Sequence, residues 1–324
     1  MSKLLTVVGA TGTQGLSLIN AALKDGSYKI RGLTRNPNSE KAAALSKRGV
    51  EVVRADINDG ASLIEAFKGS NAIFATTDFF EPFNNHGPEK AIEIETAQGI
   101  NMARAAAQTS TLEHYIWSTL PNGGKLTGGK YLIPHFVAKN RIDDYIKADE
   151  VLYPKTSFLW IAWYGNNFQY PVFTPSLMKL PGKYVQLSPV PADVPIRAIG
   201  NPIINIGIFA LAVLKKPEVT LPGRYVLAAN EESTTGKLLE DWSDVTGHAS
   251  QYVQTSTLKA YADIFPAGWG YEMGEMMVMW EELREKSWSG EEPLVTIDEL
   301  GLRDNAELTT VKDAYKAMEW STLL

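Results

Sequence analysis

Two side chains four residues apart, His135 and Lys139, have the spacing of an acid–base pair. A predicted helix over 135–146 would carry both on one face, because residues i and i+4 lie one above the other. The lysine could hold ribose hydroxyls, and the histidine could donate a proton near neutral pH. Ser118 ends the preceding predicted strand and could orient a substrate. The plainer interpretations are that His135 only begins a helix and that Lys139 lies on the surface.

A standard proton donor is missing from this arrangement. Short-chain dehydrogenases combine such a serine and lysine with a Tyr-x-x-x-Lys tyrosine, which supplies the proton. Here the tyrosine position is His135, and the nearest tyrosine, Tyr131, precedes the helix in a predicted loop. Tyr164 follows the sixth predicted strand and is a second candidate donor.

A glycine-rich turn near the start of the chain is suited to phosphate binding. An apolar run over 4–8 leads into a G-x-x-G-x-x-G pattern over 9–15, and an amphipathic segment follows. Gly9 would allow a tight turn, Gly12 the approach of a pyrophosphate, and Gly15 close packing of helix on strand. The free N–H groups at the helix start would face the phosphates. The pattern predicts a dinucleotide site formed by Gly9, Thr11, Gly12, Thr13, Gln14 and Gly15.

Other residues of the predicted cofactor site follow the next strands. Arg35 stands where NAD-preferring folds place an acid for the ribose 2′-OH, so without an acid beside it NADP(H) is favoured, unless Arg35 is merely solvated. Asp56, next to Ile57, could accept from the adenine amino group or cap the next turn. Thr76 and Thr77 follow the fourth strand, on the expected path of pyrophosphate and ribose, although ordinary turn threonines would also explain them.

Strands and helices alternate through the first half of the chain. The predicted strands after the first one are 29–34, 51–54, 72–75, 115–118 and 157–162. Short β-rich runs separated by helices imply right-handed crossovers, and so an α/β fold with a doubly wound parallel sheet of the Rossmann type.

The regular alternation of predicted strands and helices ends after Trp163. Residues 164–200 show little periodicity, whereas 203–214 suggests a helix and 224–227 a late strand of the same sheet. The rest is expected to be helices and loops. We therefore predict an NADP(H)-binding domain over 1–163 plus about 201–228, and a smaller, discontinuous domain for a substrate or partner over 164–200 and 229–324.

Composition excludes several classes of function. The 324 residues are 44% hydrophobic and carry a net charge of −6, which argues against nucleic-acid binding. The chain has no cysteine, so disulfides and thiol chemistry are excluded. The four histidines have no metal-ligand spacing, and no metal is expected. The longest apolar run, 203–214, is too short to span a bilayer. We expect no signal peptide before the first strand. We expect a cytoplasmic protein without a membrane partner.

Aromatic residues follow two of the predicted strands. One cluster lies within 79–83 and the other within 163–168. Ligand pockets are mostly apolar, so these residues could line a hydrophobic substrate cleft. Core packing would explain them equally well.

Taken in order, several short motifs resemble one family. They are GATGTQG at 9–15, TRNP at 34–37, EVVRAD at 51–56, ATTDF at 75–79, HFVAK at 135–139 and YGNNF at 164–168. The chain resembles the NmrA-like family of atypical short-chain dehydrogenases. The resemblance implies an NADP(H)-binding Rossmann domain and two alternative functions: a regulator that binds a partner protein without turnover, or a reductase. Reductases of this kind also lack the tyrosine, so His135 does not exclude catalysis.

The sequence favours an NADPH-dependent reductase of a hydrophobic small molecule such as a quinone, enone or imine. The alternative is a non-catalytic NADP(H) sensor with a regulatory protein partner. For the reductase, the candidate proton donors are His135, Tyr164 and Ser118, while Lys139 holds the nicotinamide ribose. An iminium substrate would need no donor.

Overall fold

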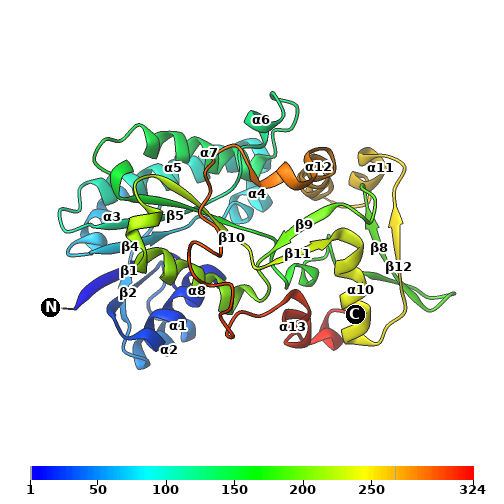
Figure 1. The fold of residues 1–324 in the computed structure, drawn as a ribbon, viewed down its shortest axis with the longest axis horizontal. Coiled ribbons are helices and arrows are strands. Elements are labelled where there is room, and N and C mark those ends of the chain that lie inside the picture. Colours follow the sequence, from blue (N-terminus) through cyan, green and yellow to red (C-terminus); the bar gives the residue numbers. More distant parts are fainter. Residues whose placement is uncertain (1, 267) are drawn as a thin grey trace.

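A seven-stranded parallel sheet forms the larger part of the computed structural model, which describes residues 2–266 and 268–324 (Figure 1). The strand order is β10-β6-β5-β4-β1-β2-β3. The strands are β1 Lys3–Val7, β2 Tyr28–Thr34, β3 Glu51–Arg54, β4 Ala72–Ala75, β5 His114–Thr119, β6 Thr156–Ile161 and β10 Arg224–Ala228. This arrangement confirms the predicted doubly wound fold, including the late strand.

Helices cover both faces of this sheet. On one face lie α1 and α8, and on the other α3, α5 and α7. Their bounds are α1 Thr13–Asp25, α3 Gly60–Phe67, α5 Pro88–Ala107, α7 Pro134–Lys147 and α8 Pro202–Lys215; α2 is Glu40–Lys47. Shorter helices are α4 Phe80–His86, α6 Gly123–Leu126 and α9 Pro217–Thr220, with 3₁₀ turns at Tyr153–Lys155, Asn167–Gln169, Arg284–Trp288 and Trp320–Thr322. The sequence had not indicated α4.

Two hydrophobic clusters form because successive strand residues point to opposite faces. On β5, Ile116 packs into the cluster beneath α1 and α8, whereas Trp117 packs into the cluster beneath α3, α5 and α7. Both faces are buried, so the middles of the central strands are mostly apolar, as in other parallel sheets, and β4 has the sequence Ala-Ile-Phe-Ala. Helix α8 lies close against α1 because Gly207 has no side chain. A Cβ there would lie 2.1 Å from the Ser17 carbonyl oxygen.

Two small sheets are built from the second half of the chain. Strands β7 Ser176–Met178, β8 Lys183–Ser188 and β12 Ser250–Gln254 pair in the order β12-β8-β7, and β9 Pro195–Ala198 pairs antiparallel with β11 Glu231–Thr234. The helices here are α10 Thr235–Thr246, α11 Leu258–Ala262, α12 Trp269–Leu283 and α13 Val311–Lys316. The expectation of only helices and loops beyond residue 229 was wrong for β11 and β12. Both are short strands whose partners lie far away in the sequence.

The elements of the large sheet fall within 1–163 and 201–228, and those of the small sheets within 164–200 and 229–324. Whether these parts behave as separate domains stays a prediction.

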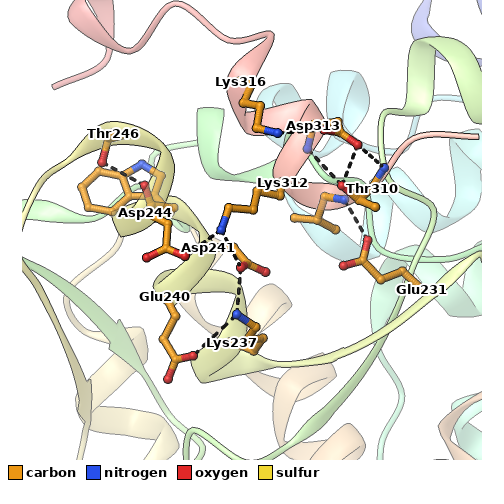
Figure 2. A network of polar contacts seen from close by, with 12 residues as sticks. Glu231, Lys237, Glu240, Asp241, Asp244, Thr246, Thr310, Lys312, Asp313 and Lys316 are labelled. Atoms are coloured by element: carbon orange, nitrogen blue, oxygen red, sulfur yellow. Dashed lines mark hydrogen bonds and ion pairs between the residues drawn. The ribbon is translucent and has the colours of Figure 1, made fainter.

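Charged side chains tie the C-terminal helix α13 to α10 (Figure 2). Lys312 Nζ lies 2.6 Å from Asp244 and 3.9 Å from Asp241. At the start of α13, the side chain of Thr310 and that of Asp313 form a capping box. The last part of the chain is thereby fixed beside the small sheets.

Candidate functional site

The turn between β1 and α1 has the geometry of a phosphate cradle. Gly9 has a φ of +66°, in the region that favours glycine. A Cβ on Gly15 would lie 2.3 Å from the Gly9 carbonyl oxygen, so only glycine lets α1 pack this closely on the turn. Gly12 caps α1 without a side-chain hydrogen bond, which leaves the first-turn N–H groups to an anion. The residues present therefore fit a dinucleotide pyrophosphate.

Gln14 connects this turn to Tyr164, beyond β6. Its Nε2 donates to the Tyr164 hydroxyl over 2.8 Å. Its Oε1 is buried and has no hydrogen-bond partner among residues 2–266 and 268–324. Burial raises the pKa of Tyr164 far above its usual value, so the phenol stays protonated. Tyr164 thus borders the dinucleotide turn, but it is a weak acid there.

Arg35, directly after β2, is paired with an acid. Its two terminal nitrogens donate to the two carboxylate oxygens of Glu81 over 2.8 and 2.9 Å. Glu81 lies in the first turn of α4, beyond β4. We assumed from the sequence that no acid lies beside Arg35. No acid is adjacent to it in the sequence, but the folded chain brings Glu81 into contact with it, so the assumption was wrong. Glu81 is 46 residues away from Arg35 in the sequence. No local sequence pattern predicts this pairing.

Asp56 and its neighbours form a turn after β3. Asp56 Oδ1 accepts from the backbone N and from the side-chain Nδ2 of Asn58, both over 2.9 Å. This is the turn-capping role that the sequence left open; contact of Asp56 or Ile57 with adenine stays a prediction. Thr76 is half-buried after β4, next to Thr77.

Lys139 lies in a buried polar cluster beside the end of β4. Its Nζ donates to Thr77 Oγ1 over 2.9 Å, and Thr77 Oγ1 donates to Glu95 Oε1 over 2.5 Å. Lys139 Nζ also lies 3.2 Å from Glu95 and 5.2 Å from the centre of the Trp117 ring. Lys139 is 8% exposed and Glu95 0%, so the surface interpretation of Lys139 is wrong.

Glu95 was missed by sequence reasoning, although a signal for it exists. On α5 it stands four residues after Ala91 and seven before Met102, both fully buried. This spacing places Glu95 on the apolar face of the helix. A carboxylate on such a face requires a cation, which Lys139 provides.

His135 is held by a second missed carboxylate. Its backbone N donates to Glu272 Oε1 over 3.1 Å, and its ring Nδ1 hydrogen-bonds to the same oxygen. Glu272 lies on α12, and both residues are buried. The rings of Phe79 and Phe80 lie beside the imidazole, with centroids 6.1 and 5.6 Å away. His135 therefore begins α7 and is also a buried, oriented imidazole. The two partners are 137 residues apart, beyond the reach of any sequence pattern.

Ser118 lies on the opposite side of β5 from the polar groups of α7. Its neighbours Trp117 and Thr119 both donate to Asp143 Oδ1, over 2.8 and 2.7 Å, and the Tyr225 hydroxyl donates to Asp143 Oδ2 over 3.0 Å. Burial raises the pKa of Asp143 to about 7. Because side chains alternate along a strand, Ser118 faces the cluster beneath α1 and α8.

The two aromatic clusters differ in their surroundings. Phe79 and Phe83 are buried and pack with Trp269 of α12. For these two residues, core packing is therefore the correct interpretation. Trp163 instead lines a small cavity together with Trp280 and other residues of the second half: Phe168, Phe173, Gln186, Leu187, Ser188, Ile196, Thr235, Leu238, Tyr252 and Met277. Among the described residues, the indole N–H groups of Trp163 and Trp280 have no acceptor.

A family model described as the NmrA-like family matches residues 1–319. The chain belongs to this family.

Several curated relatives of this NmrA-like protein are named oxidoreductases. The NmrA-like family domain-containing oxidoreductase hkm9 of Aspergillus hancockii is 34% identical over 168 residues, which cover 52% of this chain and 48% of hkm9. The chain thus matches about half the length of this relative. The oxidoreductase cpsB of Aspergillus campestris is 26% identical over 338 residues, which cover 97% of this chain and 96% of cpsB.

Solved structures share the fold at low sequence identity. NmrA, a negative transcriptional regulator crystallised with NAD, has a TM-score of 0.77 and 21% identity and covers 99% of this chain and 100% of its own. The NADPH-dependent quinone oxidoreductase QOR2 of Escherichia coli, crystallised with NADPH, has a TM-score of 0.71 and 16% identity, covering 97% and 99%.

Two further findings concern the NmrA-like chain as described. Over residues 2–266 and 268–324, no three or more His, Cys, Asp or Glu side chains gather in a way that could hold a metal ion. Within the same ranges, no helix has the length and apolarity needed to cross a membrane.

Proposed function

We propose that this NmrA-like protein is an NADPH-dependent reductase of a hydrophobic small molecule such as a quinone, enone or imine. The observation that carries the proposal is the buried chain from Lys139 through Thr77 to Glu95, at the carboxyl edge where the phosphate cradle also opens. A buried lysine held by two partners is poised to bind sugar hydroxyls with little loss of side-chain freedom. Curated relatives named oxidoreductases support this assignment.

NADP(H) is the proposed cofactor. The glycine turn with its uncapped helix suits the pyrophosphate, and Arg35 offers a bidentate donor for a 2′-phosphate. Lys139 and Thr77 are the residues that we propose contact the nicotinamide ribose. Among the structural neighbours, NmrA was crystallised with NADP as well as with NAD, and QOR2 with NADPH. When bound, NADPH supplies the hydride.

His135 is the proposed proton donor. When the imidazole is doubly protonated, Nδ1 donates to the Glu272 carboxylate, which fixes the ring, and Nε2 can give its proton to the reduced substrate, leaving a neutral imidazole. Tyr164 is less suitable because its raised pKa makes it a poor acid. Ser118 faces the other side of β5. The geometry thus favours His135 over the two hydroxyl candidates.

The cavity lined by Trp163 and Trp280 has room for about one or two water molecules, too little for a quinone or enone, so it supports a hydrophobic substrate only through its apolar lining. Its walls are largely aromatic and aliphatic, and the indole N–H groups of Trp163 and Trp280 are buried there without an acceptor among the described residues. Helix α12 carries both Trp280 and Glu272, the partner of His135. One helix therefore contributes to the cavity and to the proposed acid.

The direct test is NADPH oxidation in the presence of a panel of quinones, enones and imines. Reductase activity predicts acceptor-dependent oxidation with one reduced product per NADPH. Lys139→Met should lower kcat/KM at least about tenfold, since it removes a charged hydrogen bond worth about 1.5–3 kcal/mol. Lys147→Met, on the same helix but half-exposed and paired with Glu291, is the matched control and should stay near wild type.

The proton donor can be tested separately at saturating NADPH. His135→Ala should lower kcat about a hundredfold for ketone and quinone acceptors, whereas Tyr164→Phe should have a smaller effect. Full turnover in both variants would mean that water supplies the proton or that the substrate needs no proton donor. Tight NADP(H) binding without turnover on any acceptor would favour the alternative, a dinucleotide-sensing regulator with a protein partner.

A further inference from the structure

The Arg35–Glu81 ion pair crosses the front of the phosphate cradle. Arg35 follows β2 and Glu81 follows β4, and these two strands are the neighbours of β1 in the sheet. Strand β1 leads directly into the glycine turn at 9–15. The pair therefore joins the two sides of the crevice at the point where the adenosine end of a dinucleotide would enter.

The surroundings of Arg35 are acidic. Besides the bidentate contact with Glu81, the charges of Asp56 and Asp78 lie close enough to raise the pKa of Arg35 further. A phosphate that approached this arginine would meet three carboxylates as well as one guanidinium. Selectivity at this position thus depends on how easily Arg35 leaves its present partner.

The pair is readily opened. The side chains of Arg35 and Glu81 are 62% and 50% exposed, and ion pairs in such contact with water contribute little. Helix α4 does not depend on it, because Phe80 stacks on Trp269 with centroids 5.0 Å apart and Phe83 packs against the same ring. Arg35 can change partners while the helix stays in place.

We propose that Glu81 limits the preference for NADP(H) over NAD(H) by competing with the 2′-phosphate for Arg35. With NADP(H), the guanidinium transfers from the Glu81 carboxylate to the phosphate, and both contacts are bidentate. With NAD(H), which has no 2′-phosphate, Arg35 remains on Glu81. This inference rests on the dinucleotide site of the proposed function and adds the residue that limits its preference for NADP(H).

The test is Glu81→Gln, which keeps the shape of the side chain and removes its charge. Calorimetric titration should show NADPH binding about three- to tenfold tighter than in wild type and NADH binding changed by less than about twofold. Glu93→Gln is the matched control, because Glu93 is also an exposed glutamate paired with a cation, Lys90, over 2.7 Å. It should leave both affinities unchanged.

A double-mutant cycle identifies the route of the effect. In an Arg35→Ala background, Glu81→Gln should no longer favour NADPH beyond the general loss of one negative charge, about twofold. An equal gain for NADPH and NADH, or a gain that persists in full without Arg35, would overturn the inference and leave the proposed function standing. Failure of wild type to bind either dinucleotide would overturn both.

Discussion

The two ends of the proposed crevice hold their charges in different ways. At one end, Lys139 and Glu95 are 8% and 0% exposed and are linked through Thr77. At the other end, Arg35 and Glu81 meet with most of their side chains in water. A buried pair is expensive to break, because either partner left alone is an unpaired charge in a low dielectric. Breaking an exposed pair costs little free energy, so its members can exchange partners. The buried end can therefore fix geometry, and the exposed end can discriminate between ligands.

Breaking the buried pair should have the largest effect. Glu95→Leu leaves the Lys139 ammonium buried without a counter-charge and should lower the free energy of unfolding by about 3–5 kcal/mol. Urea denaturation measures this change. The double variant Glu95→Leu with Lys139→Met should recover much of the loss, because no charge is then left unpaired. A single-variant loss below about 1 kcal/mol would mean that the two ends do not differ as described.

A pH titration tests a further buried carboxyl group, Asp143, which accepts from Trp117, the residue whose ring lies 5.2 Å from Lys139 Nζ. Its pKa in the folded protein is about 7, above the ordinary 3.8, so folding favours the protonated acid. Its contribution to stability is therefore complete below pH 3.8 and is lost as the pH rises through about 7. Relative to Asp143→Asn, which does not titrate, wild type should lose on the order of 4 kcal/mol at most over this window.

The measurement for Asp143 is urea unfolding of both proteins at several pH values between 4 and 8. Asparagine can still accept from Trp117 and Thr119 through its oxygen, and its Nδ2 can donate to the Tyr225 hydroxyl in place of the bond that Asp143 Oδ2 accepts. The variant therefore keeps three hydrogen bonds but does not titrate. A stability difference between the two proteins that is independent of pH would contradict the raised pKa.

At the exposed end, Arg35→Ala should act on ligand binding. Loss of a charge-assisted phosphate contact should weaken NADPH by about 1.5–3 kcal/mol, or ten- to a hundredfold, and NADH much less. Calorimetric titration of both cofactors measures the ratio. Arg48→Ala, an exposed arginine after α2 that bonds Asn20, is the control. Equal weakening of NADPH and NADH would remove Arg35 from the 2′-phosphate site.

The smallest effect expected is that of the exposed pair on folding. Glu81→Gln should change the free energy of unfolding by less than about 1 kcal/mol, even though we expect it to alter cofactor preference. Urea denaturation of wild type and variant in the absence of dinucleotide checks this. A loss comparable with that of Glu95→Leu would show that the Arg35–Glu81 pair is structural.

The first half of the fold follows from local patterns. The glycine turn, the apolar strands and the alternating helices are each encoded within a few residues, and the sheet confirms them. The small sheets of the second half depend on pairings between distant segments, such as β8 with β12 and β9 with β11. Short, half-exposed strands carry little periodicity of their own, so their partners cannot be found from sequence alone.

The candidate site divides in the same manner. Lys139, Thr77 and His135 could be singled out because each belongs to a local motif. The carboxylates that hold Lys139, His135 and Arg35 were all missed: Glu95, Glu272 and Glu81. A glutamate on a predicted helix is normally assigned to the solvent, and tertiary packing alone shows which cation it meets. Glu95 and Glu272 each lie on an apolar helix face, and Glu272 stands four residues before Met276 and seven before Met279, both buried. Glu81 gives no such signal.

Because the Arg35–Glu81 pair is exposed to solvent, the strength of its electrostatic attraction depends on the salt concentration. At physiological ionic strength, charges in water are screened beyond about 8 Å. A 2′-phosphate carries more negative charge than a carboxylate, so added salt weakens its attraction to Arg35 more than that of Glu81. The preference for NADP(H) should therefore narrow as ionic strength rises, while the Lys139–Glu95 pair, shielded from solvent, is unaffected. Under this proposal, the selectivity between NADP(H) and NAD(H) depends on the ionic strength of the solution as well as on the residues of the protein.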